Sequence, residues 1–122
     1  EVVAKGFSVV YASAQNCFTW FENEKFMRDD EASRQEVERM LNCDLLLMDD
    51  LGTEMTTSFT VSALYRIVNS RLTGRKSTVI STNLKPEDLA SHYSPAISSR
   101  ILGEYKVLSF AGRDIRTLGR RG

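Results

Sequence analysis

Polar side chains that could act on a phosphate group follow an apolar run in the middle of the sequence. In Cys43–Thr53, CDLLLMDDLGT, the apolar residues run directly into Asp49 and Asp50. Two adjacent carboxylates that leave a strand point in different directions. One can hold Mg²⁺ directly or through water, while the other orients an attacking water molecule. This pairing is typical of nucleotide hydrolases, although a doubled aspartate after a buried strand also serves as an ordinary loop or helix cap.

Two further polar residues come after this acidic pair at spacings that suit the same chemistry. Asn83 ends the run TVISTN, where its amide could bind a γ-phosphate or a hydrolytic water or could simply form a turn. Arg100 lies in SPAISSRILG. A guanidinium is always charged and can reach a phosphate across a subunit boundary. An Arg100 that merely faces solvent is the alternative interpretation.

The elements that would position these residues alternate between apolar strands and amphipathic helices. The expected strands are Phe7–Ala12, Asp44–Met48, Ser77–Ser81 and Tyr105–Phe110, and the expected helices are Gln15–Arg28, Glu31–Asn42, Val61–Leu72, Pro86–Ala90 and Pro95–Leu102, after a last helical turn at Glu1–Lys5. Continuous apolar strands predict a parallel α/β sheet that is covered on both faces. Ligands bind such sheets at the carboxyl ends of the strands.

Composition limits the protein classes that need to be considered. The 122 residues allow one domain, and 16 basic residues balance 16 acidic ones. Whole-chain charge therefore does not indicate a polyanion partner, although residues 100–122 are locally basic. Cys17 and Cys43 form no CxxC motif, so reduced thiols in a cytoplasmic protein are expected. No apolar run approaches the ~20 residues of a membrane span, and no membrane association is expected.

Taken in order, the segments CDLLLMDDLGTE, STVISTNL, ISSRI and FAGRDIRTL resemble the AAA+ ATPase domain of the bacterial helicase loaders. These loaders form the DnaC/DnaI group, and the transposase-helper ATPase IstB is a near relative. The resemblance implies a parallel-sheet, three-layer P-loop NTPase core that uses ATP and Mg²⁺. It also implies a replicative helicase and single-stranded DNA as partners, and self-assembly through the ATP site.

The resemblance also implies a role for each matching residue. Asp49 would be the carboxylate that holds the metal, and Asp50 the second acidic residue, which positions the water. Asn83 would sense the γ-phosphate. Arg100 would be the arginine finger that completes the ATP site of a neighbouring subunit. Because many AAA+ proteins have Glu in place of Asp50, the shorter side chain bears on the hydrolysis rate.

One departure from the family pattern is large. The Gly-rich loop GxxxxGK[ST], which cradles the phosphates, occurs nowhere in residues 1–122, and the family's first strand is also missing. We therefore expect residues 1–122 to be the part of an AAA+ domain that follows the Walker A segment, with further residues before Glu1. Near the other end, Arg113 or Arg116 would supply a further phosphate-sensing group, with Arg116 favoured.

Three alternative functions stay open. The chain could be a phosphoacceptor receiver domain with Asp49 as the acceptor. That fold needs an acidic pair after its first strand, whereas YASAQ stands there. It could be a non-catalytic binding module on an AAA+ scaffold, or an IstB-like transposition helper. In a helicase loader or a transposition helper, Tyr65 and Arg66 are candidates to face single-stranded DNA, because such surfaces combine aromatic and basic side chains.

Overall fold

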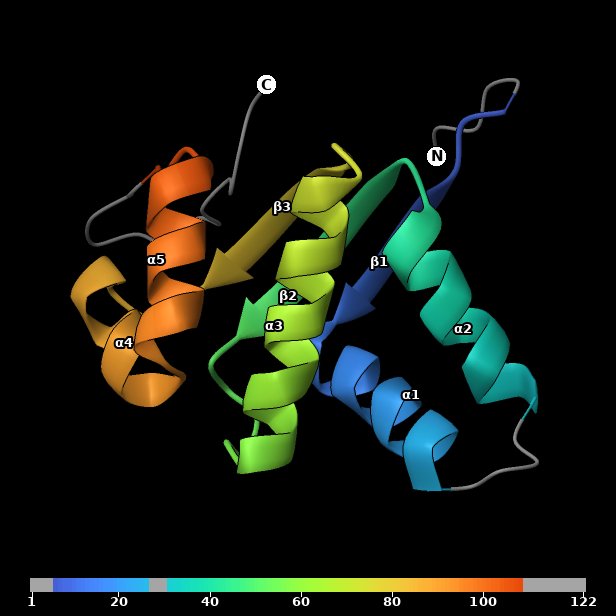
Figure 1. The fold of residues 1–122 in the computed structure, drawn as a ribbon, viewed down its shortest axis with the longest axis horizontal. Helices are drawn as coiled ribbons and strands as arrows, with labels where there is room; N and C mark the ends of the chain where they lie inside the picture. The colour runs from blue at the N-terminus through green and yellow to red at the C-terminus, as the bar shows by residue number, and fades with distance from the viewer. Residues whose placement is uncertain (1–5, 27–30, 109–122) are drawn as a thin grey trace.

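The computed structural model describes residues 6–26 and 31–108 of the chain, and Figure 1 shows how their elements are arranged. Its sheet has three parallel strands in the order β1-β2-β3. They are β1 (Val9–Ser13), β2 (Leu45–Leu51) and β3 (Ser77–Thr82). This arrangement confirms the parallel α/β sheet expected from the continuous apolar runs. It also makes the aspartate strand and the Asn83 strand direct neighbours.

Helices connect these strands and follow them. They are α1 (Ala14–Phe26), α2 (Glu31–Asn42), α3 (Ser58–Thr73), the short 3₁₀ helix η1 (Pro86–Asp88), α4 (Leu89–His92) and α5 (Pro95–Glu104). Local sequence sets several of the boundaries. Thr57 caps α3 through a reciprocal pair of hydrogen bonds with Thr60. Ser94 caps α5, whose first residue is Pro95, a residue well suited to that position.

The described helices all lie on one face of the sheet, as both figures show. Burial alternates along the strands accordingly. Val10, Leu46 and Met48 are buried toward the helices, whereas Tyr11, on the opposite face, is 68% exposed. The described residues thus form two of the three expected layers, namely the sheet and one layer of helices.

A buried arginine forms hydrogen bonds between the helical layer and the sheet at the amino ends of the strands. Arg71 of α3 has no exposed surface. Its guanidinium donates 2.8 Å hydrogen bonds to the hydroxyl of Thr78 and to the carbonyls of Met40 and Ser77. Burial lowers the pKa of Arg71 from its ordinary value. The residue therefore joins α3, the end of α2 and the start of β3 at one point.

Several element boundaries differ from the sequence expectation, among them the start of α3, which is at Ser58 and not at Val61. The aspartate strand does not end at Met48, because β2 continues through both aspartates to Leu51. Tyr105–Phe110 was expected to be a strand, but residues 105–108 form none, and the rest of that segment lies outside the described residues. The expected helical turn at Glu1–Lys5 and the end of the first helix at Arg28 lie outside them too. Within residues 6–26 and 31–108, no helix is long and apolar enough to cross a membrane.

Candidate functional site

Asp49 lies at the carboxyl end of the sheet, where side chains from both neighbouring strands hold its carboxylate. Its backbone is in register with Ser13 of β1. The Ser81 hydroxyl donates a short hydrogen bond to Oδ1, and the Tyr11 phenol donates one of 3.1 Å to Oδ2. Asp49 is half-buried. Its carboxylate is therefore fixed by its neighbours while remaining within reach of solvent.

Asp50 differs from its neighbour because the strand is irregular at this point. The pairing of β2 with β3 shifts between Met48 and Leu51, and Asp50 has a φ of 59°. Its amide donates to the Ser81 hydroxyl at 3.0 Å, and its carbonyl accepts from the Thr53 hydroxyl at 2.9 Å. A bulge of this kind redirects a side chain. As a result, Asp50 is exposed while Asp49 is held against the sheet.

Asn83 lies beside the loop that follows the acidic pair. Gly52 of that loop has a φ of +106°. A Cβ atom at Gly52 would come 2.9 Å from Cγ of Leu84 and 3.3 Å from Oδ1 of Asn83. Glycine is needed here both for its backbone conformation and for this close approach. The structure therefore brings Asp49, Asp50 and Asn83 to the same edge of the sheet, at the ends of two neighbouring strands.

Arg100 is placed differently from these three residues. It lies on α5, and its Nη2 donates a 2.9 Å hydrogen bond to Oδ1 of Asn69 on α3. Its Nε is buried and has no hydrogen-bond partner among the described residues. The guanidinium is thus anchored between two helices. Arg113 and Arg116 lie outside the described residues. Within the part of the chain that the structure describes, no three His, Cys, Asp or Glu side chains gather into a metal site.

Sequence reasoning missed the two hydroxyl residues that hold Asp49, and also a buried carboxylate behind it. Ser81 and Tyr11 come from strands more than 30 residues away along the chain. Glu54 is only 7% exposed, and it accepts hydrogen bonds from the Gly52 amide and the Tyr93 hydroxyl. The register of the sheet, once known, identifies Ser81 and Tyr11. No local pattern indicates the contact between Glu54 and Tyr93, which are 39 residues apart.

An exposed aromatic and basic cluster joins the end of α1 to the start of α3. We call Lys25, Phe26 and Phe59 the α1–α3 cluster. The two phenyl rings lie 5.8 Å apart between centroids, and Nζ of Lys25 lies 5.7 and 5.8 Å from the centroids of Phe26 and Phe59. Phe26 is 64% exposed. The cluster therefore presents an aromatic face with a positive charge beside it.

Of Tyr65 and Arg66, the two candidates to face DNA, one lies beside the α1–α3 cluster. Arg66 stacks 5.1 Å from the centroid of the Phe21 ring and forms an ion pair of 3.6 Å with Glu24. It lines the same surface hollow as the cluster residues. Tyr65 is 41% exposed but does not line that hollow.

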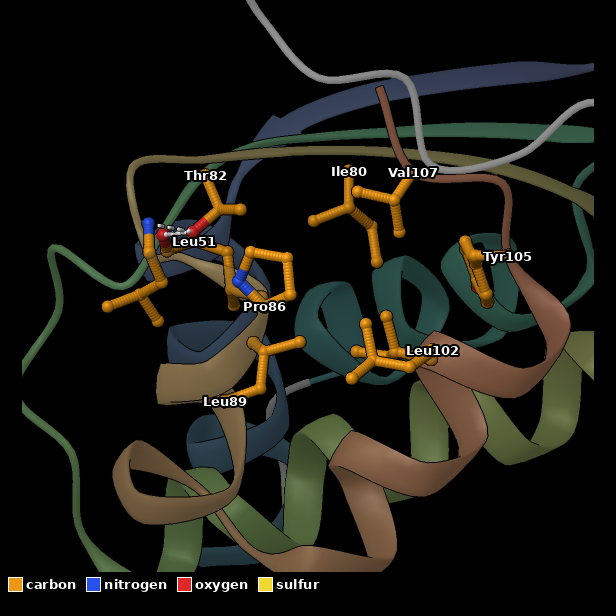
Figure 2. Close-up of a pocket in the computed structure, with 10 residues that line it drawn as sticks. Leu51, Ile80, Thr82, Pro86, Leu89, Leu102, Tyr105 and Val107 are labelled. Carbon is orange, nitrogen blue, oxygen red and sulfur yellow. Dashed lines mark hydrogen bonds between the residues drawn. The ribbon is translucent and has the colours of Figure 1, made fainter. Parts of the chain in front are cut away.

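An apolar groove runs between β3 and the α4–α5 end of the molecule (Figure 2). Its walls include Ile80 and Leu51 on the sheet side and Leu89, Leu102 and Tyr105 on the helix side. The cavity has a volume of about 60 Å³, which is room for roughly four to six water molecules at 10–15 Å³ each. It is too small for a nucleotide, and its lining suits apolar side chains.

Similarity to known proteins is found among solved structures. No protein-family model matches the sequence, and no curated protein matches it. Among solved structures, the DnaC helicase loader superposes with a TM-score of 0.65 at 24% sequence identity, over 81% of this chain and 59% of that one. A DNA replication initiation factor gives a TM-score of 0.63 at 23% identity, and AMPPCP-bound DnaA from Aquifex aeolicus gives 0.61 at 24%.

Both of the latter alignments cover 81% of this chain and 30% of the other. The chain thus spans about three fifths of the DnaC structure's length and less than a third of theirs. The three-stranded parallel sheet, the order of its helices and these superpositions agree. The chain has the α/β fold of the AAA+ P-loop NTPases.

Proposed function

We propose that this chain is part of the nucleotide-binding domain of a DNA replication protein of the helicase-loader type, which uses Mg-ATP and acts on single-stranded DNA. The observation that carries the proposal is the exposed α1–α3 cluster on a domain that also gathers Asp49, Asp50 and Asn83 at one edge of its sheet. The fold that the chain shares with a helicase loader and with replication initiation proteins supports it.

The α1–α3 cluster has the features of a surface that binds single-stranded nucleic acid. Unpaired bases stack on aromatic side chains, and nearby cations meet the phosphates. Phe26 offers an open ring, Phe59 supports it from α3, and Lys25 supplies the charge. Stacking of this kind tolerates any base, since every base has an aromatic face. Such a surface therefore suits a protein that must act at many DNA sequences.

The edge of the sheet that carries Asp49, Asp50 and Asn83, here called the acidic edge, has the oxygen ligands that a magnesium nucleotide needs. Mg²⁺ favours oxygen ligands and is usually bound by one or two carboxylates together with phosphate oxygens and water. Asp49, already oriented by Ser81 and Tyr11, would hold the metal. Asp50 would orient the attacking water, and Asn83 would contact the γ-phosphate. When bound, the metal stabilises the charge that develops on the transferred phosphoryl group.

The phosphate-binding loop has no counterpart in residues 1–122, and in this proposal further residues would supply the cradle for the β- and γ-phosphates. By the resemblance to helicase loaders, the strand before that loop would lie beside β3. The apolar groove along β3 would receive its side chains. The same resemblance suggests self-assembly through the ATP site, with Arg100 reaching a neighbour's nucleotide, and a replicative helicase as the partner.

Binding of fluorescently labelled oligo-dT to the full-length protein, followed by anisotropy, tests the role of the cluster. Phe26→Ala removes an exposed ring, so the fold should be unaffected. Stacking contributes about 1–3 kcal/mol per base, and 1.4 kcal/mol is a factor of ten. We therefore expect DNA binding to weaken about tenfold. Tyr65→Ala is the matched control, because it removes an exposed ring of α3 outside the cluster.

Two results would contradict the proposal, and they are distinguishable. If Phe26→Ala binds oligo-dT with unchanged affinity while Tyr65→Ala binds it more weakly, the α1–α3 cluster is not part of the DNA-binding surface. Equilibrium dialysis of the full-length protein against Mg-ATP tests the nucleotide site separately. Absence of ATP binding there, combined with intact DNA binding, would instead favour a non-catalytic DNA-binding module.

A further inference from the structure

The loop between β2 and α3 is attached to α4 by two side-chain contacts that neither the acidic pair nor the α1–α3 cluster uses. The Tyr93 hydroxyl donates a 2.6 Å hydrogen bond to Oε2 of Glu54. Two residues further along the loop, Oγ1 of Thr56 lies 2.8 Å from Nε2 of His92. The adjacent residues His92 and Tyr93 at the end of α4 thus bind Thr56 and Glu54 of the loop.

Glu54 is buried, and both of its carboxylate oxygens have a donor. Oε1 accepts from the Gly52 amide at 3.0 Å, and Oε2 accepts from Tyr93. Both Glu54 and Tyr93 are 7% exposed. Burial, and then the hydrogen bond to Glu54, raise the pKa of the Tyr93 phenol above its ordinary value. The phenol consequently keeps its proton and remains a donor to the carboxylate.

This contact bears on the orientation of Asp50, which lies two residues before Gly52. Asp50 holds a left-handed φ of 59°, a conformation that costs a non-glycine residue energy and persists only where its surroundings enforce it. On one side, the Ser81 hydroxyl receives the Asp50 amide. On the other side, Glu54 holds the Gly52 amide. The direction of the Asp50 side chain therefore depends on both attachments.

The other end of the contact belongs to the helices that carry Arg100. Tyr93 directly follows α4, and Ser94 then begins α5 as its N-cap. The hydrogen bond between Tyr93 and Glu54 therefore connects the junction of α4 and α5, two residues before the Arg100 helix begins, to the loop after the acidic pair. Displacement of α4 and α5 would pull on Glu54 and, through Gly52, on Asp50.

We propose that Glu54 and Tyr93 are positioning residues for ATP hydrolysis: together they hold Asp50 in its working orientation and link it to the helical unit that carries Arg100. This inference rests on the nucleotide site proposed above. Both residues are buried and hydrogen-bonded to protein groups, so we expect neither to touch the substrate. Their effect should therefore be on turnover at the assembled site, with little effect on nucleotide affinity.

Steady-state hydrolysis of Mg-ATP by the full-length protein separates these two effects. One lost hydrogen bond of about 1.4 kcal/mol corresponds to tenfold in rate. We expect Glu54→Ala to lower kcat about tenfold and to leave KM within about twofold. Glu54→Gln should recover most of the rate, since its amide oxygen can accept from Gly52 and its amide nitrogen can donate to the Tyr93 oxygen. Tyr93→Phe should lower kcat severalfold.

The matched control is Tyr105→Phe, because Tyr105 follows α5 and has the same 7% exposure as Tyr93. Its kcat should equal that of the wild type. A rise in KM at constant kcat, equal losses in Glu54→Gln and Glu54→Ala, or equal losses in both phenylalanine variants would overturn the proposal.

A nucleotide-free measurement keeps this inference separate from the proposed function. Amide hydrogen exchange of the same variants should show faster exchange at Gly52 in Glu54→Ala and protection close to wild type in Tyr105→Phe. Unchanged exchange at Gly52 in Glu54→Ala would overturn the positioning role, whatever the protein hydrolyses. Suppose instead that Gly52 exchanges faster in Glu54→Ala but the wild-type protein hydrolyses no ATP. That result would support the attachment of Gly52 by Glu54 and refute the proposed function.

Discussion

Replacing Ser81 with alanine should destabilise the acidic edge more than any other loss of a single hydroxyl there. The Ser81 hydroxyl donates to the Asp49 carboxylate and accepts from the Asp50 amide, and Ser81 itself is buried. A hydrogen bond to a charged group contributes about 1.5–3 kcal/mol. Because Asp49 is half-exposed, the lower end of that range applies. The lost partner of the Asp50 amide adds less, so the free energy of unfolding should fall by about 2 kcal/mol.

Equilibrium unfolding in urea measures this change, and a double-mutant cycle assigns it to the right pair. Ser81→Ala, Asp49→Ala and the double variant should give a coupling energy of about 1–2 kcal/mol. Ser77→Ala is the matched control, since Ser77 is exposed at the opposite end of the same strand. It should change stability by less than about 0.5 kcal/mol. A loss below that value in Ser81→Ala, with no coupling to Asp49, would refute the assignment of Ser81 as the residue that holds the carboxylate.

Two further predictions concern groups buried away from the acidic edge. Arg71→Met should lower the free energy of unfolding by about 3 kcal/mol, as measured by equilibrium unfolding in urea. The reason is that two carbonyls lose their hydrogen-bond donor, at about 1–3 kcal/mol each. Unchanged stability would mean that burying the charge of Arg71 costs as much as its hydrogen bonds contribute. Burial raises the pKa of the Cys17 thiol from 9.0 to about 12. Because the unfolded thiol ionises first, stability should be constant below pH 9 and fall between pH 9 and 12 by at most about 1.4 kcal/mol per pH unit. Cys17→Ala should lessen that slope, and an equal slope in the variant would contradict the assignment.

The sequence was informative wherever short-range chemistry determines structure. The bounds of α2 follow from its apolar period, whereas α3 begins at Ser58, three residues before the expected Val61, because Thr57 caps it. The parallel sheet follows from apolar runs without alternation. Two polar groups at strand ends, Asp49 and Asn83, could therefore be assigned to one edge before any contact was known.

What could not be read from the sequence depends on register and on long-range contacts. Asp is unfavourable in strands, yet β2 continues through Asp49 because its backbone pairs with β1. Ser81 and Tyr11 bond Asp49 only because the strands align as they do. Arg71 did leave a signal, because it falls seven residues after the buried Leu64, on the apolar face of α3. An arginine on that face indicates a buried role.

The open face of the sheet has a consequence for handling the purified chain. The described helices leave that face of the sheet uncovered (Figure 1), and Tyr11 on it is 68% exposed. The chain also has a formal net charge of zero at pH 7 and a pI of about 6.9. Exposed apolar surface promotes association, and a protein without net charge has little colloidal repulsion to oppose it. Neutral buffer should accordingly be the condition in which the chain precipitates most readily, and storage well away from pH 7 should keep it dispersed.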